Sequence, residues 1–376
     1  MSLSLPADPP RSRSLTGVVE QSLRALTGES DWFAPARSVI VFLVDGLGSH
    51  NLAARRGHAR FLGSTGGRRD VARTVFPSTT AAALTSLLTG TEPGAHGIVG
   101  YRARIPGTDV APNQLHGWET DGLDPHVWQR RAPLLETHAA SGGRAFVVSR
   151  PSYTGTGFTE ATLRGAEFFP SDDLDERVRI AADLAARHPG SITYLYAPEL
   201  DTAGHRDGWE SDRWTDALEQ LDDAARRLSN TIDPRTGVLL TADHGMVDVP
   251  AHKHVLLRDG DALLDDVALI GGEPRMLHLY TTEGRGDAVT RTWRESEDAR
   301  AWVMTRDEAI AAGLFGSRVD DDVRPRIGDV LVAARGRFAF YDDRESDKRP
   351  QRMVGQHGSL TDEERTVPLL RLGAFA

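Results

Sequence analysis

The sequence contains no cysteine among its 376 residues. This absence excludes disulfide bonds, thiolate metal ligands and cysteine nucleophiles in one step. It says little about the cellular compartment, because a protein of any compartment can lack cysteine.

Long apolar runs are missing as well. No segment is long enough to span a bilayer, and residues 1–31 are polar, with Pro6, Pro9 and Pro10 and no apolar stretch behind them. Such a start does not resemble a signal peptide. We therefore expect a flexible N-terminal arm over residues 1–31, no membrane partner and a cytoplasmic location.

A basic surface is the third missing feature. The formal net charge is −10, and the 44 lysines and arginines are dispersed along the chain. This pattern argues against binding to duplex nucleic acid through a basic face. A small anionic substrate stays possible if bound metal ions reverse the local field, because such ions are often the largest charges in a site.

Strand and helix patterns alternate from residue 32 onward. Short apolar runs of the buried-strand type occur at Val39–Val44, Ala145–Val148, Ile192–Tyr196 and Val238–Thr241. This alternation predicts an α/β fold with a mostly parallel central sheet and helices on both faces. A chain of this length suits a single catalytic domain over residues 32–376.

Two predicted helices and one region of different residue pattern complete the expected architecture. Ser211 is a good N-cap for a helix with apolar residues three and four apart, and Thr80–Leu88 forms a second helix that Gly90 ends. Between residues 255 and 350, short β-like pieces lie among charged turns. This region predicts a small additional β-containing subdomain.

Polar residues that can bind metals follow the apolar runs. Asp45-Gly46 ends one predicted strand and Asp243-His244 ends another, and an open α/β sheet places its active crevice at the carboxyl ends of its strands. Asp201, His205 and His357 stand in similar glycine-containing segments. Three carboxylates and three imidazoles suffice for two divalent cations.

The order of these segments resembles a known family. The chain contains, in order, VDG at Val44–Gly46, FPSTT at Phe76–Thr80, TG-x-x-P-x-x-HGI from Thr89, D-x-x-G-H from Asp201, ADHGM from Ala242 and G-x-HG from Gly355. Together they resemble the alkaline phosphatase superfamily, and in particular its nucleotide pyrophosphatase/phosphodiesterase branch.

The resemblance implies a role for each matching residue. Thr80 would be the nucleophile and would also contact a metal ion. One zinc ion would be held by Asp45, Thr80, Asp243 and His244, and a second by Asp201, His205 and His357. The residue chemistry agrees, because Asp and His suit zinc, and two nearby ions can stabilise both the attacking and the leaving oxygen at phosphorus.

The expected activity is therefore that of a phosphodiesterase or nucleotide pyrophosphatase with a threonine phosphoenzyme, two zinc ions and a small phosphate ester or diester as substrate. A phosphomonoesterase or phosphonate hydrolase of the same superfamily is the alternative. A non-catalytic metal-binding protein with this fold is a third possibility.

Two positions depart from the expected pattern. The nucleotide-cleaving branch usually has a base-stacking aromatic residue directly after the nucleophile and a phosphate-binding asparagine two positions further on, whereas this chain has Ala81 and Ala83. The departures leave the natural substrate open. Five other aromatic residues could line a pocket, although we expect core packing for each: Tyr101, Trp118, Trp128, Tyr153 and Phe158.

Overall fold

A seven-stranded sheet forms the centre of the molecule in the computed structural model, which describes residues 4–67 and 69–376. The strand order is β2-β15-β6-β1-β5-β3-β4, and β15 runs antiparallel to both of its neighbours. The bounds are β1 Ser38–Val44, β2 Val71–Arg73, β3 Arg144–Ser149, β4 Glu167–Pro170, β5 Ser191–Ala197, β6 Thr236–Thr241 and β15 Thr366–Gly373. The prediction of a mostly parallel central sheet is confirmed.

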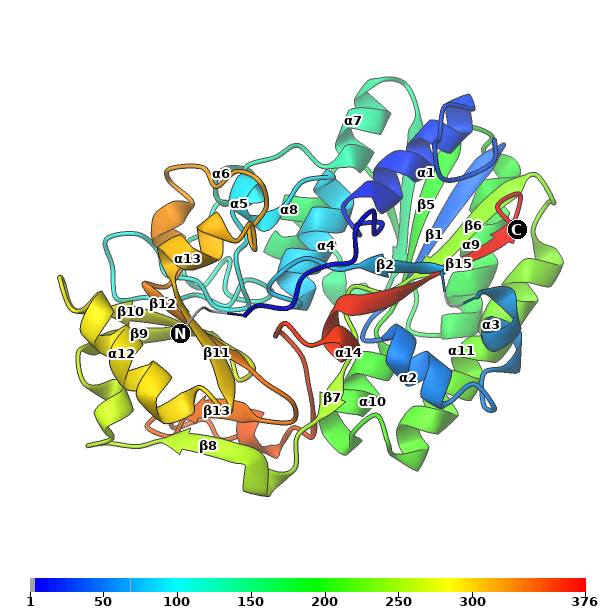
Figure 1. The fold of residues 1–376 in the computed structure, drawn as a ribbon. Coiled ribbons are helices and arrows are strands. Elements are labelled where there is room, and N and C mark those ends of the chain that lie inside the picture. The colour runs from blue at the N-terminus through cyan, green and yellow to red at the C-terminus, as the bar shows by residue number, and fades with distance from the viewer. Residues whose placement is uncertain (1–3, 68) are drawn as a thin grey trace.

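Helices cover both faces of this sheet (Figure 1). α1 (Gly17–Thr27), α4 (Thr80–Thr89) and α7 (Leu134–Ala140) pack on one face, and α9 (Leu174–Arg187) and α11 (Asp212–Thr231) pack on the other. This division follows from the right-handed connections between parallel strands. The remaining helices of this part are α2 Ser49–Ala54, α3 Arg60–Thr65, α5 Pro93–His96, α6 Pro125–Trp128, α8 Gly157–Leu163, α10 Glu199–Asp207 and α14 Asp362–Arg365.

The two helices predicted from the sequence form for the expected local reasons. The Ser211 side chain accepts a hydrogen bond from the backbone N–H of Trp214 and so caps α11, whose buried stripe includes Trp214, Leu218 and Leu228. α4 begins at Thr80 and ends where Gly90 adopts a left-handed conformation. Every residue of α4 is buried, so this helix lies inside the molecule.

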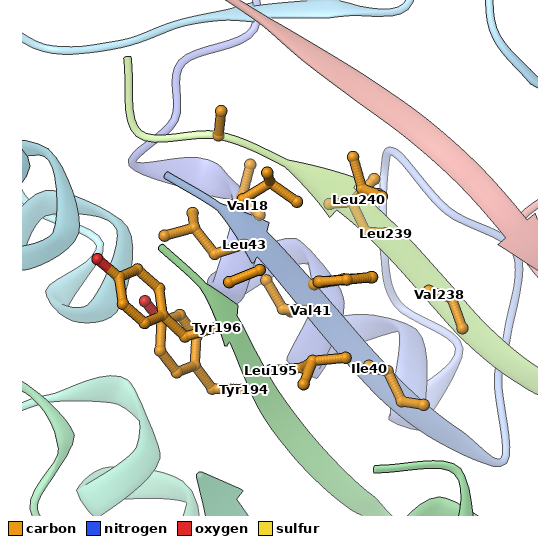
Figure 2. Packing of buried hydrophobic residues seen from close by; sticks show 14 of the residues in the cluster. Val18, Ile40, Val41, Leu43, Tyr194, Leu195, Tyr196, Val238, Leu239 and Leu240 are labelled. Carbon is orange, nitrogen blue, oxygen red and sulfur yellow. The ribbon is translucent and has the colours of Figure 1, made fainter. Parts of the chain in front are cut away.

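The N-terminal region differs from the sequence expectation. The flexible arm predicted over residues 1–31 is wrong for residues 15–27, because Leu15 and α1 pack into the main hydrophobic core. Val18, Val19 and Ala25 form the buried face of α1, and Figure 2 shows Val18 among side chains of the central strands. Burial of these apolar side chains stabilises the helix despite the polar residues around it.

A second, antiparallel sheet forms a smaller part of the molecule (Figure 1). Its order is β11-β12-β10-β9, with bounds β9 Val267–Glu273, β10 Met276–Thr281, β11 Ala301–Thr305 and β12 Val330–Ala334. Helices α12 (Gly286–Glu297) and α13 (Arg306–Ala311) pack against it. Two short pairs join β8 His254–Leu257 to β13 Ala339–Asp342 and β7 Val247–Asp248 to β14 Gly355–Gln356. The predicted additional β-containing part is therefore present.

No helix among the described residues combines the length and the apolar character that a membrane crossing requires.

Candidate active site

The seven residues singled out from the sequence converge at one edge of the large sheet. β1, β5 and β6 are adjacent and parallel, so the segments that follow them lie next to one another. Asp45 follows β1, α10 carries Asp201 and His205 after β5, and Asp243 and His244 follow β6. Thr80 is the first residue of α4, and His357 follows β14.

The first cluster surrounds His244. Its Nε2 atom lies 3.4 Å from Asp45 Oδ1, 3.3 Å from Asp243 Oδ2 and 3.0 Å from the Thr80 hydroxyl oxygen. All four residues are buried. Asp45, Asp243 and His244 offer ligand atoms within 4.8 Å of one another, which is close enough for a single ion to contact all three.

The second cluster lies beside the first. His205 Nε2 is 3.3 Å from Asp201 Oδ1 and 3.2 Å from His357 Nε2, and His357 Nε2 is 4.0 Å from Asp201 Oδ1. The rings of His244 and His357 stack with centroids 3.5 Å apart, and ligand atoms of Asp201, His244 and His357 also lie within 4.8 Å of one another. His244 thus stands between the clusters, whereas the sequence assigned it to one of them.

Hydrogen bonds fix the orientation of all three imidazoles. The Nδ1 atom of His205 lies 2.8 Å from the Gly355 carbonyl, that of His357 lies 3.0 Å from the Ser78 carbonyl, and that of His244 lies 3.2 Å from the Gly245 carbonyl. Carbonyl oxygens only accept, so each Nδ1 carries the proton and each Nε2 presents its lone pair to the centre of the site. Metal-binding histidines are commonly held in this way.

The donor set fits divalent cations. His205 Nε2 and His357 Nε2 both present lone pairs and cannot hydrogen bond to each other, yet they lie 3.2 Å apart. One carboxylate oxygen of each aspartate, namely Asp45 Oδ1, Asp201 Oδ1 and Asp243 Oδ2, is buried without a hydrogen-bond partner among the described residues. A cation between these atoms satisfies both the lone pairs and the carboxylates.

The shifted pKa values of these residues also indicate that the site fits divalent cations. Burial, followed by the charges of Asp243 and Asp201, raises the pKa of Asp45 well above its usual range. Burial, with the nearby Asp201, also raises the pKa of Asp243. Burial and the neighbouring His244 and His205 lower the pKa of His357 well below its usual range, so its ring stays neutral. Three clustered carboxylates require positive charge to remain ionised together.

Tyr196 is a residue of the site that sequence reasoning missed. It stands near the end of β5 and donates a hydrogen bond from its buried hydroxyl to Asp45 Oδ2. This contact holds one carboxylate oxygen and leaves Oδ1 free to face His244. The tyrosine lies within an apolar run in the sequence, so only its pairing with β1 reveals the role.

A cleft of about 920 Å³ opens onto the clusters. Tyr101, Tyr153 and Phe158 line it. The expectation of core packing is therefore wrong for Tyr101, whereas Tyr153 and Phe158 pack against the main core and also face the cleft. The expectation is confirmed for Trp118 and Trp128, which form a buried cluster with Ala81. The three lining residues come from loops and α8, where no periodic pattern separates a cleft position from a core position.

The interpretation of Ala83 changes with the structure. Ala83 is fully buried in the main hydrophobic core, whereas Leu84, on the next position of α4, lines the cleft. Ala83 is enclosed by the core and does not line the cleft, so the structure gives this position no contact with a bound phosphate ester. Ala81 is likewise enclosed, in the cluster with Trp118 and Trp128.

Comparison with known proteins agrees with this geometry. The model of the family "type I phosphodiesterase / nucleotide pyrophosphatase" matches residues 39–360. Over 198 residues the chain is 23% identical to an uncharacterized pyrophosphatase/phosphodiesterase of Schizosaccharomyces pombe, in a match that covers 48% of this chain and 39% of the yeast protein.

Solved structures share the fold. Murine ectonucleotide pyrophosphatase/phosphodiesterase 5 superposes with a TM-score of 0.69 at 17% identity, covering 89% of this chain and 88% of that protein. Phosphonoacetate hydrolase from Sinorhizobium meliloti superposes with a TM-score of 0.67 at 18% identity, covering 90% and 91%. An inactive variant of the murine protein has been solved with AMP, and the bacterial enzyme with phosphonoacetate.

Proposed function

Because the chain belongs to the type I phosphodiesterase/nucleotide pyrophosphatase family of the alkaline phosphatase superfamily, and so to the phosphoester hydrolases, we propose that it cleaves small phosphodiesters or pyrophosphates through a phosphorylated Thr80 and two divalent metal ions. One observation carries the proposal. Three imidazole lone pairs and three unpartnered carboxylate oxygens lie in two adjoining clusters, and the Thr80 hydroxyl contacts His244, which the clusters share.

The ligands divide between two ions. Asp45, Asp243, His244 and Thr80 would hold the first, and Asp201, His205 and His357 the second. Zinc suits this set because it prefers imidazole and carboxylate ligands in low coordination numbers. Two such ions supply charge that activates the attacking hydroxyl and stabilises the leaving oxygen of an in-line displacement.

The residues of the chain perform the group transfer in two steps. In the first, the Thr80 oxygen bonds to phosphorus while the bond to the leaving alcohol breaks, and the hydroxyl proton ends on that alcohol. In the second, a water oxygen bonds to phosphorus, the bond to Thr80 breaks, and a water proton returns to the Thr80 oxygen. The products are one alcohol and one phosphomonoester.

The position of Thr80 assists both steps. It begins α4, whose first backbone N–H groups lack partners within the helix and favour a bound phosphate. Tyr196 keeps Asp45 in place, and backbone carbonyls orient the imidazoles of His205, His244 and His357. The cleft has room for the organic groups of the substrate, and its aromatic side chains offer them apolar contacts.

A paired assay with metal analysis tests the proposal. The purified protein is analysed for bound metals and given bis-p-nitrophenyl phosphate, p-nitrophenyl phosphate and phosphonoacetate. About two metals per chain with preferred turnover of the diester supports the proposal. Preferred turnover of the monoester or of phosphonoacetate assigns the alternative hydrolase activities, and two bound metals with no turnover assigns a binding protein.

A further inference from the structure

Glu273 places a carboxyl group in the cleft that the proposed mechanism does not use. It is the last residue of β9, in the second sheet, and it lines the same cleft as Asp201 and His357. Its side chain lies against Gly358, because a Cβ atom added there would stand 2.5 Å from Glu273 Oε1. The carboxyl is thus next to the segment that carries His357.

A buried ion pair fixes the turn that presents Glu273. Two residues later in the chain, Arg275 Nε and one of its terminal nitrogens donate to the two oxygens of Glu364, each over 2.7 Å. Glu364 also accepts from the backbone N–H of Ser359 over 3.0 Å. The β9–β10 turn and the His357 loop are therefore held together, and Glu273 is not a surface side chain that happens to reach the cleft.

One oxygen of the Glu273 carboxyl lacks the donor that a buried acceptor needs. The side chain is partly exposed to the cleft, but Oε1 is buried and has no hydrogen-bond partner among the residues that the structure describes. Burial, and then the charge of Glu364, raises its pKa well above the usual range. An unpaired buried acceptor costs free energy that a donor on a ligand recovers.

The nearby hydroxyl of Thr79 does not supply Glu273 Oε1 with a hydrogen bond. The hydroxyl of Thr79, which precedes Thr80, is near enough to lower the pKa of Glu273, but neither this hydroxyl nor Glu273 Oε1 has a partner at hydrogen-bonding geometry among the described residues. Two buried polar atoms without partners, the Thr79 hydroxyl and Glu273 Oε1, therefore lie next to the segments that carry Thr80 and His357. Both the ionised and the protonated carboxyl keep an oxygen that can accept a hydrogen bond.

From this arrangement we infer that Glu273 is a specificity-determining residue, which accepts a hydrogen bond from a hydroxyl or ammonium group on the alcohol portion of the phosphodiester. The inference rests on the proposed function. It predicts that this enzyme prefers diesters of alcohols that carry such a donor near the phosphate, because a site built for a donor discriminates against analogues without one.

Three substrates with one leaving group test this inference. The metal-loaded protein is assayed with ethyl, 2-hydroxyethyl and 2-aminoethyl p-nitrophenyl phosphate, which differ only in the end of the retained alcohol. We expect kcat/KM to be about tenfold or more higher for at least one donor-bearing diester than for the ethyl diester. The hydroxyethyl and aminoethyl arms distinguish the two kinds of donor.

Variants assign the preference to Glu273. In Glu273→Met, which lacks an acceptor, the ratio of kcat/KM for the donor-bearing diester to that for the ethyl diester should fall to about one. In Glu273→Gln, which keeps one acceptor oxygen, this ratio should lie between the two. Glu345→Gln is the matched control, because Glu345 lines the same cleft but is exposed and paired with Arg102. This control should keep the wild-type preference.

Several outcomes overturn the inference. They are no preference in the wild-type protein, equal losses on all three substrates in Glu273→Met, or loss of a bound metal from that variant, which would make Glu273 a ligand. Each of these leaves the ethyl diester as a substrate of the wild-type protein. Failure of the proposed function gives a different result: either no diester is turned over, or p-nitrophenyl phosphate or phosphonoacetate is preferred to all three diesters.

Discussion

In the proposed mechanism, Thr80 acts both as the attacking group and as a neighbour of the first metal ion. Its hydroxyl donates to His244 Nε2 over 3.0 Å, and its main chain starts α4. Thr80→Ala should keep both metals but lower kcat for bis-p-nitrophenyl phosphate by about three orders of magnitude or more, because the chain loses its nucleophile. Thr80→Ser should retain activity. Elemental analysis and steady-state kinetics measure both effects, and substantial turnover by the alanine variant would assign direct attack by water.

For Ala83 we expect a substitution to change stability rather than activity. The residue is fully buried against apolar neighbours. Ala83→Asn should lower the free energy of unfolding by about 1–3 kcal/mol without raising diesterase activity, because the amide is buried without partners. Thermal denaturation and kcat/KM for the same diester decide the matter. A gain in kcat/KM would show that the position does reach the substrate.

Between elements, the ion pair of Arg275 and Glu364 connects the second sheet to the proposed metal site. Both side chains are fully buried. Glu364 binds the N–H of Ser359 through its side chain, and its carbonyl accepts from Gly245, the residue after His244. Removing one partner of such a pair typically costs about 3–5 kcal/mol, whereas replacing both by apolar residues is often neutral.

A double variant separates stability from positioning. Glu364→Gln should lower the melting temperature and weaken metal binding. Arg275→Met combined with Glu364→Leu should recover the melting temperature of the metal-free protein but not zinc affinity, which should stay about 10–100-fold weaker because Ser359 has lost its acceptor. Denaturation in chelator and competition for zinc measure the two quantities. If the melting temperature and the zinc affinity recovered together, the ion pair would have only a structural role.

At the scale of the whole molecule, metal binding and pH act on the same charges. Burial raises the pKa of Asp45 and Asp243, so the metal-free fold is favoured at low pH and loses stability as pH rises through those raised values. Burial lowers the pKa of His357, so its contribution is present above the unfolded value and is lost as pH falls toward the lowered one. Metal ions need ionised carboxylates and neutral imidazoles, and they relieve the repulsion that grows with pH.

The difference in melting temperature between metal-loaded and metal-free protein should therefore widen from about pH 5 to about pH 8. Scanning calorimetry with zinc or chelator across this range measures it. A difference that stays constant with pH would contradict the placement of the cations among these three residues.

The sequence predicts the parts of this molecule that depend on local patterns. β1, β5 and β6 are apolar at nearly every position, so both their burial and the polar residues after them are visible in the chain. α1 was missed because its apolar residues lie behind a proline-rich segment, although Val18, Val19 and Ala25 have helical spacing. Tyr196 and Glu273 could not be found, because only strand pairing and the turn after β9 bring them to the site.

The position of β15 has a consequence for how the protein is made. β6, which leads to Asp243, lies between β1 and β15, and β15 is translated after His357. A nascent chain that ends before residue 366 therefore exposes the apolar edge of β6, and exposed edges of this kind recruit other chains. Ribosomal stalling or proteolysis within the final stretch should therefore yield aggregates rather than a soluble, weakly active fragment. Only chains that include β15 should accumulate as folded protein.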